Sequence, residues 1–158
     1  MRRSDWLTST LVPVGGELMD GFGRVHRDLR ISVTDRCNLR CQYCMPEADY
    51  VWLPRADILT YEEIDTLVDI FSKLGVDKVR LTGGEPLLRT DLPALIELLA
   101  QKPALHDLAL TTNGILLADQ VTALRAAGLP RLTVSLDSLQ ADRFKALTRI
   151  GGLDAVLR

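Results

Sequence analysis

The feature that most restricts the fold of this 158-residue chain is a pattern that occurs four times after residue 28. Each time, a short run rich in Val, Ile, Leu and Thr is followed by a loop and then by a stretch with helical spacing. The strand-like runs are residues 29–34, 78–82, 107–111 and 131–136. Strands that alternate with helices predict a parallel sheet with right-handed crossovers, so the expected fold class is α/β.

The helical stretches carry their own start and stop signals. The first, residues 60–74, opens with a capping box of Thr60 and Glu63 and ends at Gly75. Its predicted apolar stripe is Ile64, Leu67, Val68, Phe71 and Leu74. The second opens at residues 90–91, and we expect it to bury Leu95, Ile96, Leu98 and Leu99. The third is predicted at 118–127 before Gly128, and the fourth runs through Phe144 and Leu147.

Residues suited to chemistry follow every strand-like run, at 37–44, 83–86, 112–114 and 135–138. Chemistry spread over the carboxyl ends of successive strands is typical of (β/α) barrels, whereas an open nucleotide-binding sheet concentrates it at one switch point. Four units cannot close a ring of eight. We therefore expect residues 29–158 to form a partial TIM-like barrel, truncated before closure, after an irregular arm at residues 1–28.

The chain's only three cysteines lie within eight residues, in the sequence Cys-Asn-Leu-Arg-Cys-Gln-Tyr-Cys at 37–44. Soft sulfur ligands suit iron–sulfur cores, and three ligands leave one metal position open. One alternative is a Cys3His zinc site that recruits His26 or His106, although neither histidine has zinc-finger spacing. The other is a buried turn in which three cysteines are merely neighbours.

The spacing of these cysteines, with Tyr43 before the last one, resembles the signature of radical S-adenosylmethionine (SAM) enzymes. The resemblance implies that Cys37, Cys41 and Cys44 hold a [4Fe-4S] cluster and that SAM chelates its fourth iron. The segment Gly-Gly-Glu-Pro at 83–86 resembles the family's GGE motif, where glycines allow close backbone approach to a ligand. The implied SAM contacts are Tyr43, Gly84 and Ser135.

A narrower resemblance covers about residues 22–158, through the segments 28–46, 78–89, 111–114 and 134–138. These segments are similar to the GTP 3′,8-cyclase family of molybdenum cofactor biosynthesis. That family uses a 5′-deoxyadenosyl radical to convert GTP to 3′,8-cyclo-7,8-dihydro-GTP, a lyase reaction. The implied GTP contacts are Arg30, Arg80 and Thr111. Guanidinium groups pair well with phosphate oxygens, but Arg80 could instead pair with Asp28, Asp35 or Asp77.

The resemblance also sets expectations for the rest of the system. It implies a second three-cysteine set with its own [4Fe-4S] cluster in a carboxyl-terminal half that these 158 residues lack. We therefore expect this piece alone to be inactive. The implied partners are GTP, an electron donor and the next enzyme of molybdopterin synthesis, and a homodimer is left open.

Two other classes of function remain open from the sequence. Another radical SAM enzyme, such as one that modifies peptides, would keep the cysteines and the GGE motif but would not need Arg30 and Arg80. A non-catalytic metal-binding module would carry the cysteines without cleaving SAM. No Walker loop, Ser–His–Asp set or zinc-protease helix motif occurs in the chain.

Charge and hydropathy restrict the partners. The formal net charge is −2, with 19 basic and 21 acidic residues interspersed, so no basic footprint for nucleic acid or an anionic membrane is present. Arg2 and Arg3 could indicate export, but residues 7–15 are too short and polar for a signal sequence. No run reaches the ~20 apolar residues of a membrane helix. We therefore expect a cytoplasmic protein, in which clustered thiols stay reduced.

Overall fold

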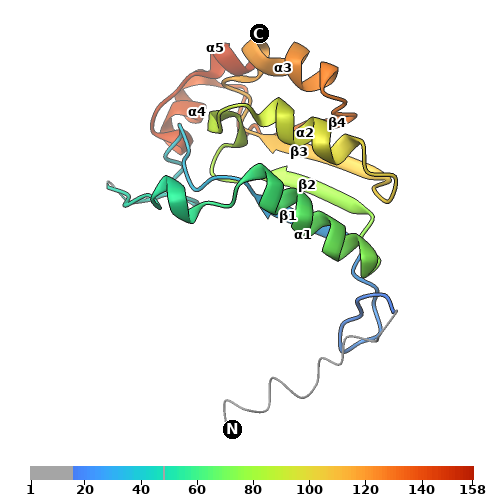
Figure 1. Cartoon of the computed structure of the whole chain (residues 1–158). Helices are drawn as coiled ribbons and strands as arrows, with labels where there is room; N and C mark the ends of the chain where they lie inside the picture. Colours follow the sequence, from blue (N-terminus) through green and yellow to red (C-terminus); the bar gives the residue numbers. More distant parts are fainter. Residues whose placement is uncertain (1–15, 48) are drawn as a thin grey trace, which may run out of the picture.

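A computed structural model describes residues 16–47 and 49–158. Strands and helices alternate along the chain as predicted (Figure 1). The strands are β1 (Asp28–Ser32), β2 (Lys78–Thr82), β3 (Asp107–Thr112) and β4 (Arg131–Val134). The α-helices are α1 (Tyr61–Lys73), α2 (Leu92–Ala100), α3 (Leu117–Ala126), α4 (Ala141–Thr148) and α5 (Leu153–Val156), and two short 3-10 helices are η1 (Arg55–Asp57) and η2 (Pro86–Leu88).

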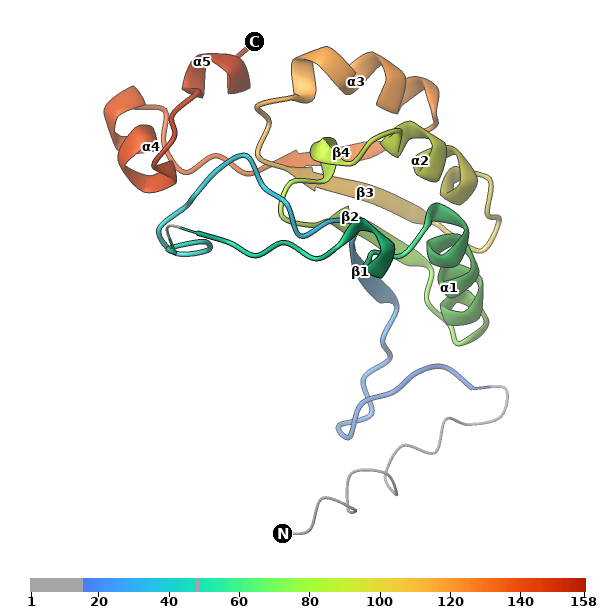
Figure 2. The same cartoon turned by 60° about the vertical axis from the view of Figure 1, so that its left-hand side comes forward.

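The four strands form one parallel sheet in the order β1-β2-β3-β4, so every strand lies beside its neighbour in sequence. Both views of the molecule show α1, α2 and α3 on the same side of this sheet (Figures 1 and 2). A doubly wound sheet would place helices on both faces, whereas a barrel places them all outside. The fold is therefore the predicted α/β type, a partial TIM-like barrel that is not closed.

The apolar core fills the space between the sheet and these helices. Side chains alternate along a strand, so Leu29 and Ile31 of β1 and Leu132 of β4 pack toward the helices. The residues between them, such as Arg30 and Thr133, face the other way. We call these two sides of the sheet the helix face and the inner face. The core between the helix face and the helices has a fully buried centre, which contains Val68, Leu81, Leu92, Leu95, Ile96, Leu99 and Leu110.

The first helix begins with the capping box that its sequence predicts. Glu63 N donates to Thr60 Oγ1 over 3.2 Å, and Thr60 N donates to Glu63 Oε2 over 2.7 Å. This reciprocal pair satisfies two N–H groups that the helix start would otherwise leave free. Ile64 and Val68 are buried, but Leu67 is 37% exposed, so the buried stripe is narrower than predicted.

The predicted burial of Leu98 is wrong, because this side chain is 40% exposed. Leu95 and Leu99 lie one turn apart and share the buried face of α2 with Ile96. Leu98 falls on the flank of that stripe. Two strands also end earlier than predicted, β1 at Ser32 and β4 at Val134, where the chain leaves the ladder for the loops described below.

Part of the predicted arm packs against the sheet–helix unit. Met19 and Val25 form an isolated antiparallel bridge, and Leu18 N donates to Leu74 O at the end of α1 over 2.9 Å. Residues 1–15, with the Arg2-Arg3 pair and the first part of the predicted arm, lie outside the described residues. Among the residues that are described, no helix combines the length and apolar character needed to cross a membrane.

Adjacent leucines of α2 test this description of the core. Leu99→Ala should lower the free energy of unfolding by about 2–5 kcal/mol, because it leaves a cavity at a fully buried position. Leu98→Ala should cost less than about 1 kcal/mol, because Leu98 is partly exposed and alanine favours helix. Urea titrations of both variants measure the difference, and equal losses would contradict the assigned faces.

Candidate active site

The three cysteines lie in the loop that follows β1, at the carboxyl end of the sheet (Figure 1). Cys37 and Cys41 are partly buried and Cys44 is exposed. Cys37 and Cys41 pack against a small cluster of Leu39, Phe144 and Leu153, apart from the main core. This second cluster anchors one side of the cysteine loop to α4 and α5.

Backbone contacts with the loop after β2 hold the start of the cysteine loop. Gly84 N donates to Thr34 O and Glu85 N to Arg36 O, each over 2.7 Å. A Cβ atom on Gly84 would lie 2.3 Å from Arg36 O, and one on Gly83 would lie 2.7 Å from Thr34 O. The two glycines therefore have an intramolecular role, because only residues without a side chain allow these loops to pack together.

Glu85 is the buried centre of the carboxyl edge and was not singled out from the sequence. Its side chain is 1% exposed, and Oε1 accepts from Leu87 N (3.0 Å) and from Thr112 Oγ1 (2.7 Å). Oε2 accepts from Asn113 N over 2.7 Å. These donors compensate for the burial of the carboxylate and join the loops after β2 and β3. The available signal was a charged residue between Gly-Gly and the apolar run Pro-Leu-Leu.

Asn113, in the loop after β3, reaches the cysteine loop directly. Its Nδ2 donates to Asn38 Oδ1 over 2.7 Å and lies 4.0 Å from Cys37 Sγ. Its Oδ1 accepts from Ile115 N over 3.1 Å. The sequence placed this residue at a strand end but indicated no partner for it.

The middle of the cysteine loop packs against the end of α4. Arg40 N donates to Thr148 O and Gln42 N to Leu147 O, each over 3.0 Å. These carbonyls belong to the last turn of α4, where helix carbonyls have no partner within the helix. The loop that carries the cysteines thus supplies hydrogen-bond donors to the C-terminal carbonyl groups of α4.

Tyr43 connects the cysteine loop to the segment after β4. Its hydroxyl donates to Asp137 Oδ2 over 2.8 Å, and this hydrogen bond to a carboxylate raises the pKa of Tyr43. Ser135, two residues before Asp137, is exposed at the edge, and its backbone N donates to Thr112 O over 2.8 Å. The three predicted SAM contacts, Tyr43, Gly84 and Ser135, therefore all lie around the cysteine loop.

An arginine and two aromatic rings cover another part of the loop. Arg40 Nη1 donates to Cys37 O and to Leu39 O, each over 2.8 Å. Its guanidinium carbon lies 5.6 Å from the centroid of the Tyr50 ring and 5.3 Å from that of Trp52, and the two rings stack. The cation–π contacts with these rings help to hold the Arg40 guanidinium where it donates to the loop backbone.

Burial dominates the electrostatics of the thiols. It raises the pKa of Cys37 and of Cys41, and the charges of Glu85 near Cys37 and Asp137 near Cys41 add to the rise. Ionisation of the neighbouring cysteines raises these pKa values in the same direction. Within residues 16–47 and 49–158, no three Cys, His, Asp or Glu side chains are gathered as a ready-made metal site.

The set of donors nevertheless fits an iron–sulfur cluster, because one short loop carries three soft thiols. The histidines of the zinc alternative lie elsewhere. His106 Nδ1 is 3.5 Å from Asp77 Oδ2 at the start of β3, and His26 precedes β1. Both are at the amino ends of strands, at the opposite edge of the sheet from the cysteines.

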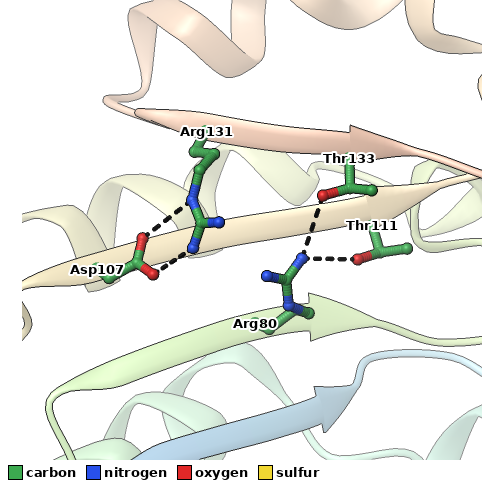
Figure 3. A network of polar contacts seen from close by, with 5 residues as sticks. All are labelled: Arg80, Asp107, Thr111, Arg131 and Thr133. Atoms are coloured by element: carbon green, nitrogen blue, oxygen red, sulfur yellow. Dashed lines mark hydrogen bonds and ion pairs between the residues drawn. The ribbon is translucent and has the colours of Figure 1, made fainter.

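The inner face of the sheet carries the predicted GTP contacts, of which Figure 3 shows Arg80 and Thr111. Arg80 Nη1 donates to Thr111 Oγ1 (3.2 Å) and to Thr133 Oγ1 (3.3 Å). Arg30 is the register partner of Arg80 on β1. Among the described residues Arg80 makes no ion pair, and Asp77 is paired with Arg27 over 2.6 Å. The hydroxyl contact of Thr133 was not predicted, because it depends on the β3–β4 register.

Arg30 and Arg80 line a hollow of about 160 Å³ on the inner face. Arg131, on β4, lies in the same cross-strand row and is paired with Asp107, as Figure 3 shows. Its Nε lies 3.3 Å from Asp107 Oδ1. The charged residues that line the hollow are Asp28, Arg30, Lys78, Arg80, Asp107 and Arg131. Four cations against two carboxylates make this hollow suited to an anionic ligand.

The chain is similar to a known family and to named enzymes over most of its length. The model of the Radical SAM superfamily matches residues 31–158. A GTP 3′,8-cyclase 3 of Mycobacterium bovis is 58% identical over 138 residues, which are 85% of this chain and 36% of that protein. A GTP 3′,8-cyclase of Listeria monocytogenes is 54% identical over 140 residues, 89% of this chain and 42% of that protein. The chain thus spans 36–42% of the length of these relatives.

Solved structures share the fold at low sequence identity. Streptococcus suis SuiB bound to S-adenosylmethionine has a TM-score of 0.62 and 20% identity, over 82% of this chain and 29% of that one. Methylornithine synthase (PylB) has a TM-score of 0.62 and 17% identity, over 82% of this chain and 39% of that one. At these identities the likeness is one of fold.

Two glycines test the packing of the loops. Gly84→Ala should lower the free energy of unfolding by about 1–3 kcal/mol, because its Cβ collides with backbone that cannot move independently. Gly21→Ala is the matched control, since a Cβ there meets nothing within 4 Å, and it should change stability by less than about 0.5 kcal/mol. Chemical denaturation measures both, and a Gly84 variant as stable as the control would contradict the packing.

The raised thiol pKa values predict slow alkylation of the metal-free chain. Only the thiolate reacts with iodoacetamide, so near the ordinary thiol pKa of about 8.5 a raised pKa leaves Cys37 and Cys41 mostly protonated. Both should react more slowly than in the urea-unfolded chain, and the gap should narrow as the pH rises further. Peptide mass spectrometry follows each site, and equal rates in the folded and unfolded chains would contradict this.

Proposed function

Because this chain belongs to the radical SAM superfamily, we propose that it supplies the SAM-cleaving part of a GTP 3′,8-cyclase. The relatives that carry this name are 54–58% identical to it, which supports the proposal. The reaction would convert GTP to 3′,8-cyclo-7,8-dihydro-GTP in molybdenum cofactor biosynthesis. This activity would belong to the whole protein, because the matched relatives are longer than this chain, which spans 36–42% of their length.

Cys37, Cys41 and Cys44 hold the cluster in this proposal, and the carboxyl ends of β2, β3 and β4 hold the cysteines. When bound, the [4Fe-4S] cluster supplies the electron for reductive cleavage of SAM, and an external donor provides that electron. Three thiolates would hold three irons of such a cluster and leave one iron position open for SAM. The contacts that hold the cysteine loop would therefore determine where the cluster lies in the protein.

The SAM contacts follow from the same edge. Ser135 is exposed, and among residues 16–47 and 49–158 its hydroxyl makes no hydrogen bond, so it is available to a ligand. Gly84 brings its peptide close to Arg36, next to the first cysteine. Tyr43 stands at the other end of the loop and is oriented by Asp137. All three residues lie at the carboxyl edge of the sheet, in the cysteine loop or in the loops after β2 and β4.

The observation that carries the choice of GTP is the inner face beneath this edge. Arg80 is held by two neutral hydroxyls rather than by a carboxylate, so its charge stays available for a phosphate. Arg30 adds a second guanidinium beside it in register. Thr111 both contacts Arg80 and faces the same space, which supports its assignment to the substrate site.

Arg80 provides a test of the substrate. Arg80→Ala should weaken GTP binding roughly 10-fold to 100-fold, because a charge-assisted hydrogen bond contributes about 1.5–3 kcal/mol. Arg125→Ala, on the exposed surface of α3, is the control and should bind GTP as the unaltered chain does. Isothermal titration calorimetry measures both. GTP binding that is unaffected by Arg80→Ala would favour a radical SAM enzyme with another substrate.

SAM cleavage is tested separately. The whole protein is reconstituted anaerobically with iron and sulfide, then treated with dithionite and SAM, and 5′-deoxyadenosine is measured by chromatography. We expect 5′-deoxyadenosine from the unaltered whole protein and none after Cys41→Ser. Product formation without the cysteines, or none with them, would contradict the assigned cluster ligands.

A further inference from the structure

Asn113 lies between the buried carboxylate of Glu85 and the first cysteine, in a position where its side chain can act on the cluster site. Its backbone N donates to Glu85 Oε2 over 2.7 Å, so the residue is tied to a group that is 1% exposed. Thr112, its neighbour, donates to the other oxygen of the same carboxylate over 2.7 Å. A shift of this segment would remove two of the three donors to a buried carboxylate, which is costly.

The orientation of the Asn113 amide is determined by its partners. Ile115 N donates to Oδ1 over 3.1 Å, and only the carbonyl oxygen of the amide can accept that bond. The NH2 group must therefore face the cysteine loop. There it donates to Asn38 Oδ1 over 2.7 Å, which uses one of its two hydrogens.

The second hydrogen is directed to the Cys37 side, where Nδ2 lies 4.0 Å from Sγ. Leu39 N donates to the same sulfur over 3.4 Å. Hydrogen bonds to ligand sulfurs favour the more negative, reduced form of an iron–sulfur cluster, and so raise its reduction potential. Glu85 acts in the opposite direction, because its negative charge near Cys37 disfavours added electrons.

We infer that Asn113 is a positioning residue that sets the reduction potential of the cluster held by Cys37. It does so by tethering the cysteine loop through Asn38 and by donating to the Cys37 sulfur. The one-electron reduction that it adjusts takes its electron from an external donor and converts [4Fe-4S]2+ to [4Fe-4S]+. This inference rests on the proposed cluster site.

The test compares three variants of the reconstituted chain by redox titration with dithionite, monitored by electron paramagnetic resonance (EPR). Asn113→Ala removes both donors, and Asn113→Asp replaces the NH2 group by an oxygen of nearly the same size. Both should lower the midpoint potential, with Asn113→Asp lower than Asn113→Ala because it adds a negative charge. A tenfold change in the reduction equilibrium corresponds to about 59 mV for one electron, which sets the size of shift to look for.

Asn38→Ala separates tethering from tuning. It removes the acceptor of the 2.7 Å bond but keeps the Asn113 amide beside Cys37. We expect faster loss of iron to a chelator with a smaller change in potential than in either Asn113 variant. A merely structural role for Asn113 would speed iron loss in all three variants alike and leave their potentials unchanged.

The outcomes distinguish this inference from the proposed function. If the unaltered chain assembles no cluster, the proposed cluster site is wrong. If it does, and both Asn113 variants keep the potential of the unaltered chain, the inference is overturned. Should Asn113→Ala fail to fold, the near-isosteric Asn113→Asp decides, and an unchanged potential in that variant alone is sufficient to reject the tuning role.

Discussion

The close approach of two backbones at the carboxyl edge of the sheet determines where everything else in the site lies. The loop after β2 donates two hydrogen bonds of 2.7 Å to residues 34–36, and a Cβ atom on Gly84 would meet Arg36 O at 2.3 Å. Because there is no room for a side chain, the segment that enters the cysteine loop has one position relative to β2. The buried carboxylate of Glu85 then connects this contact to β3, and Tyr43 and α4 complete the attachment on the other side.

The two faces of the sheet divide stability from chemistry. Alternation along each strand sends leucine, isoleucine and valine to the helices and leaves arginine, threonine and aspartate on the inner face. In a closed barrel that inner face would be enclosed by further strands, where unpaired charge is expensive without a ligand. Within the described part of the chain, Arg80 is held by threonine hydroxyls alone, and an anionic ligand would compensate for its charge. The cysteine loop lies at the carboxyl end of the same sheet.

Local signals were sufficient to predict most of the fold. These signals, such as the capping box of Thr60 and Glu63, depend on neighbours in sequence. The structure contains all four predicted strands and all four predicted helices. Leu98 was misassigned because periodicity alone does not show where a buried stripe ends. Motifs were sufficient to single out the cysteines and arginines as candidates, whereas they indicated no partners for Glu85, Asn113 and Thr133. Those contacts join residues 27–76 positions apart and depend on register and loop packing, which no local pattern encodes.

The central claim is that the cysteine loop holds a cluster with one iron reserved for SAM. EPR of the reduced, reconstituted chain, recorded with and without SAM, tests it most directly. Direct chelation of an iron changes the ligand field at the cluster, so SAM should shift the g values of the [4Fe-4S]+ signal. A cluster whose spectrum is the same with and without saturating SAM would contradict the account.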